Sequence, residues 1–132
     1  MQAIRMRPMG EQRTHDRSGP YPYRGKTLYE WLPFVVERIV ENFDPFRIIV
    51  FGSVARGDAN YDSDIDLLVV FDEVEWAEKR NVTVEIRRTL ADFPVSKDII
   101  VTDTDEIRRR GHLVGPILRP ALEEGRVVYE RP

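Results

Sequence analysis

Two aspartates, Asp64 and Asp66, stand at the head of an apolar run that continues to Phe71. Side chains alternate across a β-strand, so residues two positions apart project from the same face. Paired carboxylates at the start of an otherwise apolar strand repel each other unless a cation lies between them. The pair therefore indicates a site for a divalent metal ion, for which carboxylate oxygens are suitable ligands.

Twelve residues before Asp64, Gly52 and Ser53 follow another apolar run, Phe46–Phe51. A turn at glycine carries no Cβ, so the backbone N–H groups of such a turn can approach and cradle a phosphate. A phosphate site on one side of a divalent metal site is the layout of phosphoryl or nucleotidyl transfer. The spacing thus favours transfer chemistry at phosphorus.

Asp98 is a third candidate, because it is a charged residue inside the run Val95–Val101. Three aspartates in strand contexts suffice to bind two Mg²⁺ ions with help from substrate phosphates and water. Taken singly, Asp64 and Asp66 could lie in a solvated turn, and Asp98 could protect a sheet edge. Taken together with Gly52–Ser53, they favour a metal-and-phosphate site.

Helical and strand patterns alternate along the part of the chain that must position these residues. The expected helices are about Pro33–Asn42, Val74–Leu90, a short one from Asp103 to Arg110 and Gly111, and about Pro116–Glu124. The expected strands are Phe46–Phe51, Asp64–Phe71, Val95–Val101 and an edge-like Val127–Tyr129. Both faces of Asp64–Phe71 are largely apolar, as expected for a central strand with helices packed on it.

The length of 132 residues leaves room for one domain. Residues 1–25, with five arginines against two acidic residues, are expected to be a flexible basic tail, either a mobile extension or an arm for RNA or a partner. Residues 26–132 form the domain, with fifteen basic against twenty-one acidic residues. This acidic body argues against broad, salt-driven binding of nucleic acid.

The chain contains no cysteine, so it has neither a disulfide framework nor a thiolate metal site. No apolar run approaches the length of a membrane span, and the N-terminus does not resemble a signal peptide. A cytoplasmic setting without membrane contact is therefore expected. Trp31 and Trp76 are expected in the core or at an interface.

The motifs Gly-Ser-Val-Ala-Arg-Gly at 52–57 and Ser-Asp-Ile-Asp-Leu at 63–67 resemble the signature of the polymerase-beta-type nucleotidyltransferase superfamily. The small size of the chain, and Glu-Gly-Arg-Val-Val-Tyr-Glu at 124–130, resemble the minimal (MNT) branch of that superfamily. The resemblance covers about residues 28–130. It implies an α/β (α+β) fold in which a mixed sheet of three to four strands is flanked by helices.

The resemblance also implies roles for particular residues. Gly52 and Ser53 would hold the β- and γ-phosphates of a nucleoside triphosphate, for which ATP is expected. Asp64 and Asp66 would bind two metal ions, Mg²⁺ or alternatively Mn²⁺. Asp98 would be the third carboxylate, which binds the catalytic metal and helps to deprotonate the acceptor hydroxyl.

Arg56 belongs to the motif, and either contacts phosphate or braces the turn. The implied enzyme transfers AMP to a hydroxyl, and the expected acceptor is a small helical HEPN-type protein in a toxin–antitoxin-like pair. Two alternatives stay open. The acceptor could be a small molecule, as in the aminoglycoside-modifying relatives, with a homodimer building its pocket. Otherwise the chain could be an antitoxin that neutralises its partner by binding alone.

Overall fold

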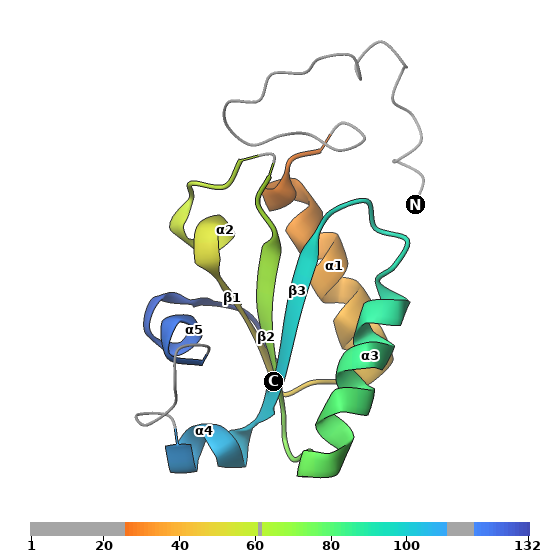
Figure 1. Cartoon of the computed structure of the whole chain (residues 1–132), viewed down its shortest axis with the longest axis vertical. Coiled ribbons are helices and arrows are strands. Elements are labelled where there is room, and N and C mark those ends of the chain that lie inside the picture. The colour runs from red at the N-terminus through yellow and green to blue at the C-terminus, as the bar shows by residue number, and fades with distance from the viewer. Residues whose placement is uncertain (1–25, 61, 111–117) are drawn as a thin grey trace.

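The strands of the computed structural model form one mixed sheet in the order β3-β2-β1-β4 (Figure 1). The model describes residues 26–60, 62–110 and 118–132, so the predicted tail at 1–25 and the predicted helix start at Pro116 lie outside the described residues. The strands are β1 (Arg47–Phe51), β2 (Ile65–Phe71), β3 (Lys97–Asp103) and β4 (Arg126–Glu130). β1 is antiparallel to β2 and β4, and β2 is parallel to β3. The predicted mixed sheet is confirmed, with β4 at one edge.

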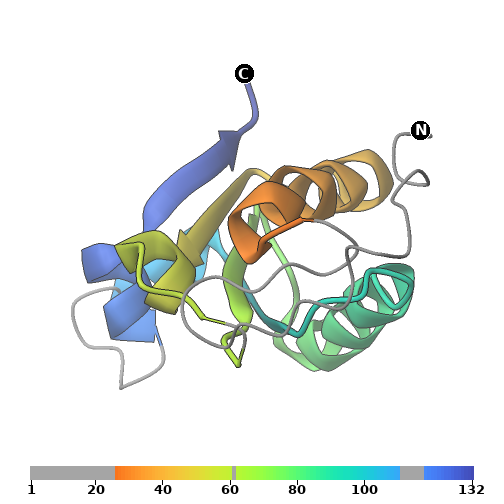
Figure 2. The same cartoon turned by 90° about the horizontal axis from the view of Figure 1, so that it is seen from above.

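Helices cover both faces of this sheet (Figure 2). On one side lie α1 (Leu28–Phe43) and α3 (Lys79–Thr89), the latter preceded by a single 3₁₀ turn, η3 (Trp76–Glu78). On the other side lie α2 (Gly52–Arg56), α4 (Thr104–Arg110) and α5 (Leu118–Glu124). No helix in the described ranges is both long and apolar enough to cross a membrane.

The two faces of β2 enter two different apolar clusters. Ile65, Leu67 and Val69 are fully buried in the larger cluster, which α1 and α3 close. Leu68 and Val70 are fully buried in the smaller one, beneath α5. Burial of alternate residues on both faces is the signature of a central strand, and it fixes the register of β2, since a slip by one residue would exchange the two faces. Asp66, at the beginning of the strand, projects on the same side as Leu68.

Helix α1 begins at Leu28, five residues earlier than predicted. The predicted start assigned Pro33 to the first helical turn, whereas Pro33 lies inside the helix. The true start is a capping box: the Thr27 side chain accepts from the Glu30 amide, and the Glu30 side chain accepts from the Thr27 amide. The box satisfies amides that the first turn would otherwise leave unpaired, so it outweighs the preference of proline for the helix start.

Two further predictions need correction. The connector after Gly52 contains a short helix, α2, which was not predicted. The third strand starts at Lys97 rather than Val95. Trp31 is in the core, at 4% exposed, whereas Trp76 is 85% exposed, so of the two predicted places, core or interface, an interface stays a prediction for Trp76.

Candidate active site

Asp66 and Asp98 are direct neighbours on adjacent parallel strands. The register of β2 and β3 pairs Asp66 with Asp98, and the same pairing continues with Leu68 and Ile100. Because side chains alternate, both carboxylates project from the face that carries Leu68 and Ile100. Two aspartates that are 32 positions apart in the chain are therefore brought to one place by strand pairing.

On its other side, Asp66 lies against the glycine turn. The register of β1 and β2 pairs Asp66 with Phe51, the residue before Gly52. Gly52 has a φ of +73°, and a Cβ built on it would lie 2.1 Å from Asp66 Oδ2. A side chain at position 52 is thus excluded both by the backbone conformation and by the carboxylate. With glycine at position 52, the turn predicted to bind phosphate can lie directly against Asp66, which is predicted to bind metal.

Asp64 completes the group, although it lies one residue before β2. The Ile65 amide donates to the Ser96 carbonyl at 2.9 Å, which joins the start of β2 to the approach to β3. Asp64 and Asp66 are half-buried, whereas Asp98 is exposed. The sequence-predicted carboxylates are therefore all found at one end of the β2–β3 pair.

The electrostatics of this end favour a cation. Burial, together with the charges of Asp98 and Asp64, raises the pKa of Asp66 to about 6, and the charge of Arg56 acts in the opposite direction. A carboxylate whose charge is disfavoured by two like charges is a group that a divalent cation would stabilise. The donor set consists of oxygens, which suits Mg²⁺ or Mn²⁺.

The carboxylates are not drawn together around a common point. Within residues 26–60, 62–110 and 118–132, no three histidine, aspartate or glutamate side chains are close enough to form a ready metal-binding group. Like-charge repulsion gives a physical reason, since carboxylates that share a site without a cation separate. Asp98 Oδ1 lies 3.7 Å from Arg87 on α3, a neighbour that the sequence did not predict.

Arg56 ends α2 and is exposed. Its guanidinium lies 3.4 Å from Asp58 Oδ2 and 3.4 Å from Glu124 Oε1, so it ties α2 to the end of α5. These contacts are the kind that bracing of the turn would use, and both roles of Arg56, bracing and contact with phosphate, stay predictions. Ser53 supports the same turn through its carbonyl, which accepts from the amides of Gly57 and Asp58.

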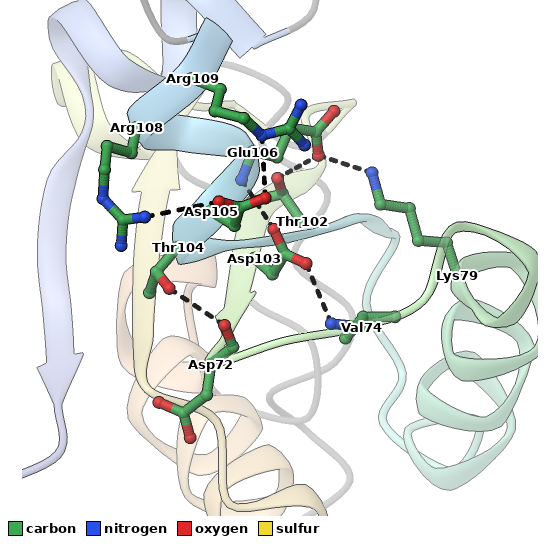
Figure 3. A network of polar contacts seen from close by, with 10 residues as sticks. All are labelled: Asp72, Val74, Lys79, Thr102, Asp103, Thr104, Asp105, Glu106, Arg108 and Arg109. Carbon is green, nitrogen blue, oxygen red and sulfur yellow. Dashed lines mark hydrogen bonds and ion pairs between the residues drawn. The ribbon is translucent and has the colours of Figure 1, made fainter.

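A second polar cluster lies at the opposite end of β2 and β3 (Figure 3). Asp103 accepts from the Glu106 amide at 2.8 Å and from the Val74 amide at 2.9 Å. Glu106 in turn accepts from Lys79 Nζ at 2.5 Å and from the Thr102 hydroxyl. Asp103 therefore caps the first turn of α4. Each of these carboxylates has a cationic or hydrogen-bonding partner, so we interpret the cluster as one that stabilises the fold.

Comparison with known proteins agrees with the geometry. The model of the nucleotidyltransferase domain family matches residues 33–126, a range that includes the glycine turn and all three aspartates. The chain belongs to this family and is a nucleotidyltransferase. The predicted resemblance to polymerase-beta-type nucleotidyltransferases is thereby confirmed.

Two solved structures are similar to the chain. A candidate nucleotidyltransferase from Sulfolobus solfataricus has a TM-score of 0.57 and 25% identity, over 79% of this chain and 81% of that one. A mutant of the toxin–antitoxin MntA–HpeT has a TM-score of 0.46 and 14% identity, over 75% of this chain and 73% of that one, a likeness too weak to argue from. No curated protein matches the chain.

Proposed function

We propose that this chain transfers AMP from ATP to a hydroxyl group on a partner protein, with release of pyrophosphate. The observation that carries the proposal is the register that pairs Asp66 with Asp98 while Gly52 lies against Asp66. Asp64, Asp66 and Asp98 would hold two divalent ions, which would neutralise charge on the phosphorus and on the leaving oxygen. Mg²⁺ is the proposed ion and Mn²⁺ the alternative.

The residues around the glycine turn would bind and orient the nucleotide. The amides of Gly52 and Ser53 open α2, where no side chain caps the first turn, so they would be free to donate to the β- and γ-phosphates. Arg56 would leave Asp58 and Glu124 to meet the same phosphates, an exchange of two exposed ion pairs for charge-assisted contacts with phosphate.

Asp98 would take part in the transfer itself. Its exposed carboxylate lies beside Asp66 and would accept the proton of the incoming hydroxyl. The hydroxyl oxygen would form a bond to the α-phosphorus as the bond to the pyrophosphate oxygen breaks. Arg87, 3.7 Å from Asp98 Oδ1, would have to release this carboxylate first.

A domain of about a hundred residues offers little surface to hold an acceptor as well as a nucleotide. We therefore propose that a separate, small helical protein of the HEPN type supplies the hydroxyl, as in a toxin–antitoxin-like pair in the cytoplasm. Trp76, 85% exposed, suits contact with such a partner, because large aromatic side chains are enriched at interfaces. A homodimer stays a prediction, as do base preference for ATP and the alternative of a small-molecule acceptor.

The test uses ATP labelled in the α- or the γ-phosphate, incubated with Mg²⁺, this chain and the candidate partner. Label from the α-position on the partner, with none from the γ-position, is the expected result. Asp64→Ala with Asp66→Ala should abolish labelling, while Asp62→Ala, which removes an exposed carboxylate two residues before Asp64, should not. Tight binding of the partner without any label would replace transfer by neutralisation through contact alone.

A further inference from the structure

Asp64 differs from the other two aspartates in how the fold holds it. Asp66 lies within β2 and Asp98 within β3, so sheet hydrogen bonds fix their backbones. Asp64 lies just outside β2, at the end of the connector that leaves α2 at Gly57. Its position therefore depends on what holds this connector as well as on Ile65, whose amide is bound to Ser96.

Among the described residues, the hydrogen bonds that hold the connector include a local set near its end and one bond to α1. Near its end, the Asn60 amide donates to Ser63 Oγ at 2.8 Å, and the Ser63 amide donates back to the Asn60 carbonyl at 3.0 Å. Near its middle, the Ala59 amide donates to the Tyr29 hydroxyl at 2.8 Å. The first contact is local to the connector. The second ties it to α1, 30 positions earlier in the chain.

Tyr29 is a firm anchor for such a contact. It is the second residue of α1, in the turn that the Thr27–Glu30 capping box fixes. Its half-buried ring packs against the larger apolar cluster. Ala59 is only 3% exposed, so its amide is sheltered from water and costs stability if left unpaired. The hydroxyl of Tyr29 is thus the group that a buried amide of the connector depends on.

We infer that Tyr29 is a positioning residue for Asp64: its hydroxyl fixes Ala59, and through it the connector that delivers the Asp64 carboxylate to the site. The inference rests on the proposed function, because it assigns Asp64 a metal to bind. Tyr29 is not among the residues proposed to bind metal or nucleotide. Its contribution is to reduce the freedom of a ligand that no strand holds, as residues supporting a metal site commonly do.

The test is Tyr29→Phe in the full chain, which removes one oxygen and keeps the ring. The matched control is Tyr129→Phe, since Tyr129 also packs half-buried on the larger apolar cluster but lies in β4. Binding of Mn²⁺ is followed by electron paramagnetic resonance, and exchange of the Ala59 amide by nuclear magnetic resonance. We expect the Mn²⁺ dissociation constant to rise about fivefold, and Ala59 exchange to quicken about tenfold, in Tyr29→Phe alone.

Two backgrounds separate positioning of Asp64 from a general loosening of the fold. In Asp64→Asn, the added Tyr29→Phe should cause no further loss of Mn²⁺ affinity, because the ligand it positions is already impaired. In Asp98→Asn, the loss of about fivefold should persist. In the otherwise unaltered chain, saturating Mn²⁺ should restore the turnover of Tyr29→Phe, which a merely structural defect would not permit.

Each failure has its own meaning. If the unaltered chain binds Mn²⁺ and Tyr29→Phe binds it equally well, the role of Tyr29 is wrong and the proposed function stands. An equal loss in the Asp64→Asn and Asp98→Asn backgrounds also overturns that role, as does unchanged exchange at Ala59. If the unaltered chain does not bind Mn²⁺, the proposed metal site is wrong, and the role of Tyr29 with it.

Discussion

The two ends of the β2–β3 pair carry carboxylates whose pKa values are shifted in opposite directions. At one end Asp66 lies beside Asp98, and at the other Phe71 lies beside Asp103. Burial and the charges of Asp98 and Asp64 raise the pKa of Asp66 to about 6. Burial alone would also raise the pKa of Asp103, but the amides of Val74 and Glu106 outweigh it and hold that pKa below its ordinary value.

Under the proposed function, this difference separates a carboxylate that stabilises the fold, Asp103, from one that takes part in the chemistry, Asp66. The chain supplies donors for Asp103 from two segments, so the charge of Asp103 joins α4 to the end of β2. For Asp66 the chain supplies two more carboxylates, opposed by Arg56, and under the proposed function a divalent ion would supply the remaining compensation. Functional sites commonly destabilise the fold when their ligand is absent, and stabilising contacts elsewhere in the molecule must offset that cost.

The largest expected effect follows from removing the charge of Asp66, at the end of the β2–β3 pair where it lies beside Asp98. Asp66→Asn should reduce the rate of nucleotidyl transfer by about 10³-fold, because the lost charge is the one that would hold the metal at the reacting phosphate. The thermal midpoint should stay or rise, since a like charge is removed. Initial rates with α-labelled ATP and a melting curve measure the two quantities.

The matching change at the opposite end of the β2–β3 pair, where two amides donate to Asp103, is Asp103→Asn. At a temperature where it remains folded, this variant should transfer at a rate within about twofold of the unaltered chain, because Asp103 lies far along the strand from the reacting groups. A loss of activity as large as that of Asp66→Asn would remove the distinction between the two ends.

A smaller effect is expected on stability when Asp103 is truncated. Asp103→Ala should lower the free energy of unfolding by about 2–3 kcal/mol, because it removes the cap of α4 and leaves the Val74 amide without its acceptor. Urea titration followed by circular dichroism measures this change. Asp105→Ala is the control: Asp105 is a half-exposed partner of Arg108 and Arg109, and its loss should cost less than about 0.5 kcal/mol. Equal losses would show that capping at Asp103 contributes nothing.

Much of the site could be predicted from the sequence because it depends on strand alternation. The i, i+2 spacing of Asp64 and Asp66, and the charged residue at 98 inside an apolar run, identified the carboxylates without coordinates. The parallel pairing of Asp66 with Asp98 could not be read from either strand alone. It results from the crossover through α3, whose apolar side must pack on the larger cluster.

What the sequence did not reveal depends on contacts between distant residues or on very short elements. The five-residue helix α2 is too short to show apolar periodicity. The hydrogen bond from Ala59 to Tyr29 and the ion pair of Arg87 with Asp98 leave no trace in local patterns. The capping box at Thr27 did carry a signal, Thr-x-x-Glu, but Pro33 offered a competing helix start.

The smallest expected effect concerns pH, and its sign differs between the two ends. The pKa of Asp66 in the folded chain, about 6, is above the ordinary 3.8, so the folded state binds this proton more tightly than the unfolded state does. The contribution of protonated Asp66 to stability is therefore full below pH 3.8 and is lost as the pH rises through 6. The lowered pKa of Asp103 acts in reverse, because its contribution is present above pH 3.8 and is lost as the pH falls below that value.

Comparison of the unaltered chain with Asp66→Asn isolates the first contribution. At pH 7 the variant should be more stable by about 1 kcal/mol, a value discounted because Asp66 is only half-buried. At pH 4 the difference should nearly vanish, as protonated aspartate resembles asparagine in charge. Urea titrations at the two pH values measure this difference in stability. An equal difference at both pH values would mean that the neighbouring charges do not destabilise ionised Asp66. Addition of Mn²⁺ at pH 7 should then stabilise the unaltered chain, because the cation takes the place of the proton at Asp66. The stability of the variant should stay nearly unchanged.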